Sequence, residues 1–278
     1  MTRHFLRDDD LTPAQQAGVL ALAARLKADP FALRPLEGPR TVAVLFDKPT
    51  LRTQASFTSG IAELGGFPMV IDARLAQVGT RESVSDTARV LGRQASLVVW
   101  RTFGQDRLEE MAEHAGVPVV NALTDQFHPC QVLADLLTVQ EHRGTLPGRR
   151  LVFLGDAASN MAHSYLLGGA TAGMHVTVSG PEGFAPDPAV LARAQEVAAS
   201  TGGSAAYDPD PVRAVSSADA VATTSAPSTA ARGSEVYDAE PPVETAISCA
   251  RASTAGSGSK PSGPATVTCM PAVVPPRR

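Results

Sequence analysis

The chain has 278 residues with 24 Lys and Arg against 28 Asp and Glu, which gives a formal net charge of −4. This mildly acidic balance excludes the strongly basic surface of a nucleic-acid-binding protein, and no apolar run reaches the roughly 18 residues of a transmembrane helix. The first ten residues contain no apolar segment of a secretory signal. Because the three cysteines are odd in number and far apart, they predict a reducing compartment without a disulfide framework, and we expect a soluble, cytoplasmic protein.

The first part of the chain alternates helix-like and strand-like segments. Thr12 followed by Pro13 and Gln15 is the pattern of a capping box with proline in the first turn, and it predicts a helix over 12–27. The spacing of apolar residues predicts further strands and helices up to residue 143. The expected strands are 42–46, 69–71, 97–100 and 117–120, and the further helices are 53–64, 83–91, 106–115 and 128–143.

A second alternating series begins near Leu146. Its predicted strands are 151–154, 176–178 and 218–222, and its predicted helices are 160–173 and 188–199. Repeated strand–helix units of this length predict parallel sheets with right-handed crossovers. We therefore expect an α/β fold with two doubly wound parallel-sheet domains, 1–145 and 146–225, joined by the long helix that follows His128.

The composition changes in the last part of the chain. Residues 226–278 contain no Leu, Phe or Trp and are rich in Ala, Pro, Ser and Thr. Such a segment has little apolar area to offset the conformational entropy that is lost on ordering. We therefore predict an irregular, atypical C-terminal tail.

An anion site is predicted where the strand 42–46 leads into the next helix. Residues Thr50–Thr53 lie at a helix N-terminus, which attracts anions, and Arg52 adds a planar guanidinium that matches phosphate. Arg101 follows the strand 97–100, so it is expected at the same sheet edge. The alternatives are an ordinary helix cap with a surface arginine, and a rim salt bridge for Arg101. The motif lacks the glycines of a Walker A loop.

The segment His128–Gln131 opens another helix, with Pro129 where the first turn tolerates proline. His128 and Gln131 are three residues apart, so both side chains can lean over one end of the helix. A neutral imidazole and an amide in that position can polarise a carbonyl group. One alternative is a structural histidine at a capped helix start. Another is a thiol hydrolase built from His128 and Cys130, which is disfavoured because no orienting third residue is evident.

Two weaker motifs complete the set. The loop around Gln77 and Gly79 precedes a helix and is by itself typical of a simple connection. The segment Leu154–Ser164 is a predicted strand, turn and helix, with Asn160 at the turn. It resembles a dinucleotide-binding turn but lacks the glycine pattern, which disfavours a nicotinamide cofactor.

Together these motifs resemble those of the aspartate/ornithine carbamoyltransferase family, and most closely those of its ornithine branch. The order and spacing agree over residues 1–225. His-Pro-Cys-Gln followed by Asn-Met-Ala-His-Ser is specific to the family. The matching stretches are Thr50-Leu-Arg-Thr53, Arg101-Thr-Phe103, His128-Pro-Cys-Gln131 and Asn160-Met-Ala-His-Ser164.

The resemblance implies transfer of the carbamoyl group of carbamoyl phosphate to the δ-amine of L-ornithine, giving citrulline and phosphate in arginine biosynthesis without a metal or organic cofactor. Domain 1–145 would bind carbamoyl phosphate and domain 146–225 ornithine. The family forms homotrimers, in which Gln77 would reach a neighbouring subunit's site; neither nucleic acid nor membrane is an implied partner. The resemblance implies the catalytic residues His128, Gln131 and Arg101. It implies that carbamoyl phosphate binds to Thr50, Leu51, Arg52, Thr53, Gln77, Arg101, His128 and Gln131. It implies that ornithine binds to Asn160, Ser228, Cys269 and Met270.

The chain also departs from the family pattern. Gln54 replaces an arginine and Leu51 a threonine, so a lower phosphate affinity is expected. Ser228 is the candidate match for the family's ornithine-binding Ser-Met, but the acidic residue of that motif is absent, and Cys269-Met270 resembles the family's Cys-Leu. Two alternatives therefore stay open. One is a C-terminally degraded, non-catalytic relative that binds carbamoyl phosphate, and the other is a carbamoyltransferase for another amine such as acetylornithine.

Overall fold

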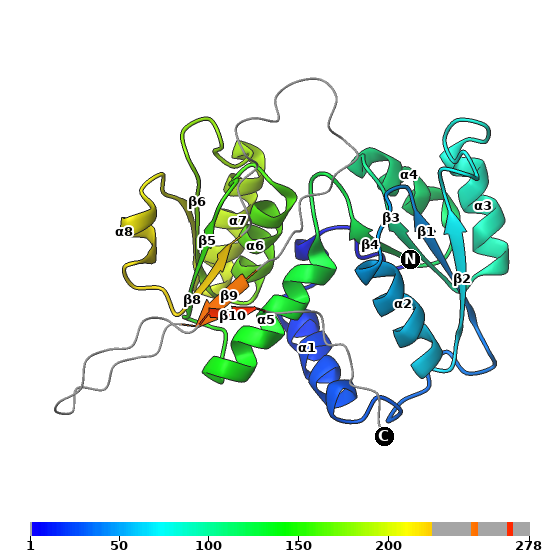
Figure 1. Ribbon diagram of the computed structural model, residues 1–278, viewed down its shortest axis with the longest axis horizontal. Coiled ribbons are helices and arrows are strands. Elements are labelled where there is room, and N and C mark those ends of the chain that lie inside the picture. The colour runs from blue at the N-terminus through cyan, green and yellow to red at the C-terminus, as the bar shows by residue number, and fades with distance from the viewer. Residues whose placement is uncertain (1, 224–245, 250–265, 269–278) are drawn as a thin grey trace. The chain divides into compact units, whose positions relative to one another are not determined.

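The computed structural model describes residues 2–223, 246–249 and 266–268. The chain divides into two compact units, Met1–Leu133 and Ala134–Arg278, and the boundary falls inside one long helix. Figure 1 shows that each unit has a central sheet with helices packed on it. Among the described residues, no helix is both long enough and apolar enough to cross a membrane.

The first unit is built on a four-stranded parallel sheet with the strand order β2-β1-β3-β4. Every helix and strand predicted up to residue 143 is present, which confirms that part of the prediction. Its elements are η1 (Asp8–Asp10), α1 (Pro13–Ala28), β1 (Thr41–Phe46), α2 (Arg52–Glu63), β2 (Phe67–Asp72), α3 (Val84–Gln94), β3 (Leu97–Arg101), α4 (Gln105–Ala115), β4 (Val119–Leu123) and α5 (Pro129–Arg143), the last of which continues into the second unit. The strand β4 begins at Val119 and not at Val117, because Pro118 has no N–H group to donate to a ladder.

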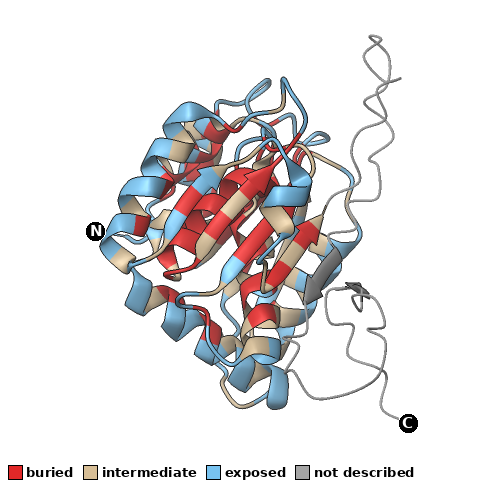
Figure 2. Cartoon of the chain, turned by 90° about the vertical axis from the view of Figure 1, so that its left-hand side faces the viewer, coloured by how far each residue is buried: buried red, intermediate tan, exposed pale blue. Residues whose placement is uncertain are grey.

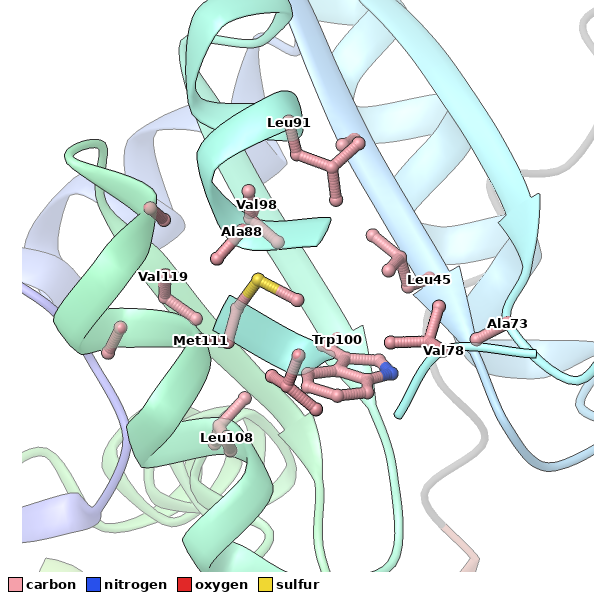
Figure 3. Packing of buried hydrophobic residues seen from close by; sticks show 14 of the residues in the cluster. Leu45, Ala73, Val78, Ala88, Leu91, Val98, Trp100, Leu108, Met111 and Val119 are labelled. Carbon is pink, nitrogen blue, oxygen red and sulfur yellow. The ribbon is translucent and has the colours of Figure 1, made fainter. Parts of the chain in front are cut away.

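Side chains of β1 and β3 alternate between the two faces of this sheet. Leu45 and Trp100 belong to a cluster with residues of α3 and α4, whereas Val44 and Val99 belong to a cluster with Ile61 of α2. Figure 3 shows side chains of the larger cluster, with the Trp100 ring among them. Helices thus cover both faces, which is the doubly wound arrangement that the sequence predicts.

The second unit has a sheet with the strand order β10-β9-β8-β5-β6-β7, in which β8, β5, β6 and β7 are parallel. The helix α6 is buried from Met161 to Thr171 because it packs against the sheet and against α7. Figure 2 shows buried residues concentrated in the central strands and exposed residues on the outer helix faces. The elements are β5 (Arg150–Leu154), α6 (Asn160–Thr171), β6 (His175–Ser179), α7 (Pro188–Thr201), β7 (Ser204–Tyr207), α8 (Pro211–Val215), β8 (Ala220–Thr223), β9 (Ala246–Cys249) and β10 (Thr266–Thr268).

Several of these elements are not predicted by the sequence: η1, β7, α8, β9 and β10. Each has five residues or fewer, which is too short for a hydrophobic period to show. The strands β9 and β10 also fall in the tail that we predict to be irregular. There β9 pairs antiparallel with β8, and β10 with β9. The other residues of the tail lie outside the described residues.

Candidate active site

Three motif loops meet at one edge of the first unit's sheet. They follow β1, β3 and β4, which are parallel, hydrogen-bonded neighbours, so their carboxyl ends lie together. The first loop leads to the N-terminus of α2, the second begins at Arg101, and the third leads to His128. In open α/β sheets, ligands bind at this edge.

The loop after β1 ends at Leu51, which is the N-cap residue of α2. Leu51 makes no side-chain cap hydrogen bond and is 82% exposed. A leucine side chain cannot cap the first N–H groups of a helix, and a helix N-terminus attracts anions. Arg52 is exposed and Thr53 is partly buried on the same turn.

Arg101 is the last residue of β3 and points to the face that carries α2. The alternation explains this direction, since Trp100 faces α3 and α4 and the next side chain must face the other way. The Arg101 Nη1 atom donates to the Thr53 hydroxyl oxygen at 3.3 Å, and the residue is only 8% exposed. Arg101 is thus buried and donates to a hydroxyl group. This arrangement argues against the alternative of an exposed salt bridge at the rim of the site.

His128 lies immediately before α5, which begins at Pro129 as predicted. Burial lowers the pKa of its imidazole, and the positive charges of Arg101 and Arg52 lower it further, to about 3. The imidazole is therefore neutral at physiological pH. The charges of both arginines act on His128, so the three sequence motifs lie near one another at this sheet edge.

We expect His128 to make the folded protein less stable in mild acid. Its folded-state pKa of about 3 lies below the ordinary value of about 6.5. Between these values the unfolded chain binds the extra proton, so the free energy of unfolding falls as the pH decreases. Urea unfolding from about pH 7 to about pH 4 should show a steeper loss of stability for the wild type than for His128→Asn. Equal slopes in the two proteins would contradict a neutral imidazole with a lowered pKa.

Cys130 does not have the environment of a catalytic thiol. Its Sγ atom donates to the Asn121 carbonyl oxygen at 3.3 Å, and burial, with the nearby Asp8 carboxylate, raises its pKa to about 12. A nucleophilic cysteine needs a lowered pKa and a base that accepts its proton. Because the thiol stays protonated, the structure argues against the thiol hydrolase.

A buried polar network that the sequence does not indicate holds the loop before His128. The Thr124 hydroxyl donates to the Gln105 side-chain oxygen at 2.8 Å and accepts from the Phe127 backbone N–H at 3.1 Å. The Thr124 N–H donates to the Phe127 carbonyl oxygen at 2.9 Å. Buried hydrogen bonds of this kind are costly to break, so the turn that presents His128 is tightly defined.

Gln77 lies in the loop between β2 and α3, which leaves the same end of the parallel sheet as the loop after β1. It is exposed and has a positive φ of 53°, which is uncommon for a residue other than glycine. It lines a pocket of about 540 Å³ together with Asp47, Phe103 and Arg107. Arg107 donates to the Val78 carbonyl oxygen at 2.8 Å, which ties this loop to α4.

Thr50 and Gln54 line a smaller pocket of about 190 Å³ beside the α2 N-terminus. Lys48 and Arg74 supply positive charge to its wall, and Asp72 supplies negative charge. Gln54 is exposed. The neutral amide that stands where the family pattern has an arginine therefore faces solvent.

Two family models match the chain. One, described as the carbamoyl-P binding domain of aspartate/ornithine carbamoyltransferase, covers residues 3–141, and the other, described as the Asp/Orn binding domain, covers residues 147–238. The chain belongs to the aspartate/ornithine carbamoyltransferase family. The resemblance inferred from the four motifs is thereby confirmed.

Individual relatives agree with this assignment. An ornithine carbamoyltransferase of Clavibacter sepedonicus is 62% identical over 223 residues, which are 80% of this chain and 73% of that relative. The solved structure of ornithine carbamoyltransferase from Gloeobacter violaceus is 44% identical, with a TM-score of 0.73, over 80% of this chain and 74% of that one. That from Pyrococcus furiosus is 38% identical, with a TM-score of 0.76, over 80% and 71%.

The second unit carries the family motif that contains Asn160. Asn160 is the first residue of α6, directly after the N-cap Ser159, whose hydroxyl accepts from the Ala162 N–H at 3.4 Å. His163 of the same motif is buried and accepts from the Asp187 N–H at 3.2 Å, so it helps to hold the start of α7. Three further candidates for this family's ornithine site, Ser228, Cys269 and Met270, lie outside the described residues.

In the part of the chain that the structure describes, no group of three or more His, Cys, Asp or Glu side chains is arranged to hold a metal ion. Of the predicted residues, the structure brings together Arg52, Thr53, Arg101 and His128.

Proposed function

We propose that this chain is an ornithine carbamoyltransferase, which transfers the carbamoyl group of carbamoyl phosphate to the δ-amine of L-ornithine. The observation that carries the proposal is the neutral His128 within electrostatic reach of Arg101 and Arg52 at one sheet edge. The relative from Clavibacter sepedonicus has the name of this enzyme. The proposed domains are 1–145 for carbamoyl phosphate and 146–225 for ornithine.

The phosphate group is proposed to bind at Thr50–Thr53, with Arg52 and Arg101 as its cationic partners. The N-terminus of α2, where the Leu51 side chain makes no cap hydrogen bond, attracts anions. The Arg101 guanidinium already donates to the Thr53 hydroxyl, and this contact keeps its planar group beside the same turn.

The carbamoyl group is proposed to contact His128, Gln131 and the Thr53 hydroxyl. The carbonyl oxygen gains negative charge as the ornithine δ-nitrogen forms its bond to the carbamoyl carbon, so hydrogen-bond donors aimed at that oxygen stabilise the transition state. The carbon–oxygen bond to phosphate then breaks with its electron pair on phosphate, and the amine loses one proton. Holding both substrates side by side removes an entropic barrier of up to about 7–11 kcal/mol.

The remaining assignments follow the family motifs. Asn160 is proposed to bind the amino-acid end of ornithine, together with Ser228, Cys269 and Met270. Gln77 is proposed to reach the carbamoyl phosphate of a neighbouring subunit in a cytoplasmic homotrimer of arginine biosynthesis, and its exposure in the single chain agrees with such a contact. Sedimentation measures the trimer, and a monomer would argue against the shared site.

The decisive experiment measures citrulline formation from carbamoyl phosphate and L-ornithine, with N-acetyl-L-ornithine as a second acceptor, beside calorimetric titration of carbamoyl phosphate alone. Citrulline formation supports the proposal. Product from acetylornithine alone identifies another acceptor, and binding without turnover identifies a non-catalytic relative. If carbamoyl phosphate neither binds nor reacts, the proposed function is wrong.

A further inference from the structure

The side chain of Lys48 contacts both of the other motif loops. Lys48 itself lies in the loop after β1, two residues before Thr50. Its Nζ atom lies 2.6 Å from the Asp125 Oδ1 atom in the loop after β4, and 4.3 Å from the centroid of the Phe103 ring in the loop after β3. The first contact is an ion pair and the second is a cation–π contact.

Each contacted residue is close in sequence to a proposed binding residue. Phe103 is two residues after Arg101, and Asp125 is three residues before His128. The backbone links the same two loops, because the Asp125 N–H donates to the Phe103 carbonyl oxygen at 2.8 Å. A shift of Lys48 would therefore reach all three loops of the candidate site.

We propose that Lys48 is a positioning residue, which fixes the phosphate-binding turn relative to Arg101 and His128 through Asp125 and Phe103. This inference rests on the proposed function, because it assigns the phosphate to Thr50–Thr53 and the carbamoyl group to His128. The distance between these loops sets the distance between the groups that bind the two ends of carbamoyl phosphate. A misplacement of about 1 Å costs up to about 100-fold in rate.

The ion pair has the character of a positioning contact more than of a stabilising one. The Lys48 side chain is 20% exposed and the Asp125 side chain is 57% exposed. Ion pairs at such exposure contribute little to stability. Loss of the pair is therefore expected to change catalysis much more than thermal unfolding.

Asp125→Asn separates positioning from simple charge attraction. If Lys48 acted only as a positive charge near the phosphate, removal of the neighbouring carboxylate would strengthen the binding of this anion. If the pair positions the loops, the same substitution weakens binding and turnover. The two ideas thus predict opposite signs for one nearly isosteric change.

The experiment measures kcat and KM for carbamoyl phosphate in Lys48→Met, Asp125→Asn and the double variant. We expect each single variant to lose about tenfold in kcat/KM, the double variant to lose no more than the worse single one, and Lys48→Arg to recover most of the activity. Amide exchange should become faster in residues 124–128 of Lys48→Met. The matched control is Arg193→Met, because Arg193 forms an exposed ion pair with Glu196 at 3.2 Å on α7, and it should behave like the wild type.

Tighter carbamoyl phosphate binding by Asp125→Asn, additive losses in the double variant, or unchanged amide exchange in residues 124–128 of Lys48→Met would each overturn the positioning role. The exchange measurement does not depend on turnover. A wild type that neither binds nor converts carbamoyl phosphate would therefore refute the proposed function, while the exchange result would still show whether Lys48 holds the His128 loop.

Discussion

His128→Ala is expected to lower kcat for citrulline formation by about 100-fold to 1,000-fold, which is the usual cost of removing one hydrogen-bond donor to a developing oxyanion. The neutral imidazole is proposed to act on the carbamoyl oxygen as it gains charge, so the loss should appear mainly in kcat and less in KM. Steady-state kinetics in both substrates at neutral pH measures the effect.

His142→Ala is the matched control for this substitution. His142 is on the same helix, α5, but it is exposed and near the other end. It should keep wild-type kinetics. If His128→Ala kept kcat within about twofold of the wild type while both proteins remained folded, His128 would be a structural histidine, and the proposed transition-state contact would be wrong.

Arg101→Met is expected to lower kcat/KM for carbamoyl phosphate by about 100-fold or more. Each hydrogen bond to a charged group contributes about 1.5–3 kcal/mol, and a guanidinium makes two such bonds to one phosphate. Methionine keeps much of the apolar stem in this buried position, so the fold should survive. Calorimetric titration of carbamoyl phosphate gives the affinity, and thermal unfolding checks that the protein is folded.

Two comparisons test the reason for the Arg101 effect. Arg101→Lys keeps the charge but not the planar pair of donors, so it should recover affinity only in part. Arg93→Met removes an exposed arginine near the end of α3 and should bind carbamoyl phosphate like the wild type. Full recovery by Arg101→Lys would show that charge alone is needed, and unchanged affinity of Arg101→Met would remove Arg101 from the site.

The local features of this fold follow from short stretches of sequence. Thr12 and Gln15 form the predicted capping box, with the Gln15 side-chain oxygen accepting from the Thr12 N–H at 2.9 Å. Pro129 opens α5 as its fixed φ allows. Parallel strands with their connecting helices also determine that the loops after β1, β3 and β4 share one sheet edge.

The contacts within the candidate site could not be predicted from the sequence. Nothing in the motif Phe46–Gln54 shows that Lys48 pairs with Asp125, which is 77 positions away. The network of Thr124 with Gln105 likewise joins residues from two different segments, 19 positions apart. The order of the motifs indicates which loops form the candidate site, but it does not identify the side chains that hold those loops in place.

The sequence by itself determined the two α/β units, the sheet edge at which the candidate site is expected, and the family. Hydrophobic periods and motif spacing indicate these features because both are visible within a few residues to a few tens of residues. The tertiary structure decided that Arg101 faces Thr53, 48 positions away, and that His128 is neutral. Strand alternation sets the direction of the Arg101 side chain, but its contact with Thr53 depends on which face of the sheet α2 covers. The pKa of His128 depends on burial and on charges from two other loops. Those quantities exist only when the distant segments are packed together.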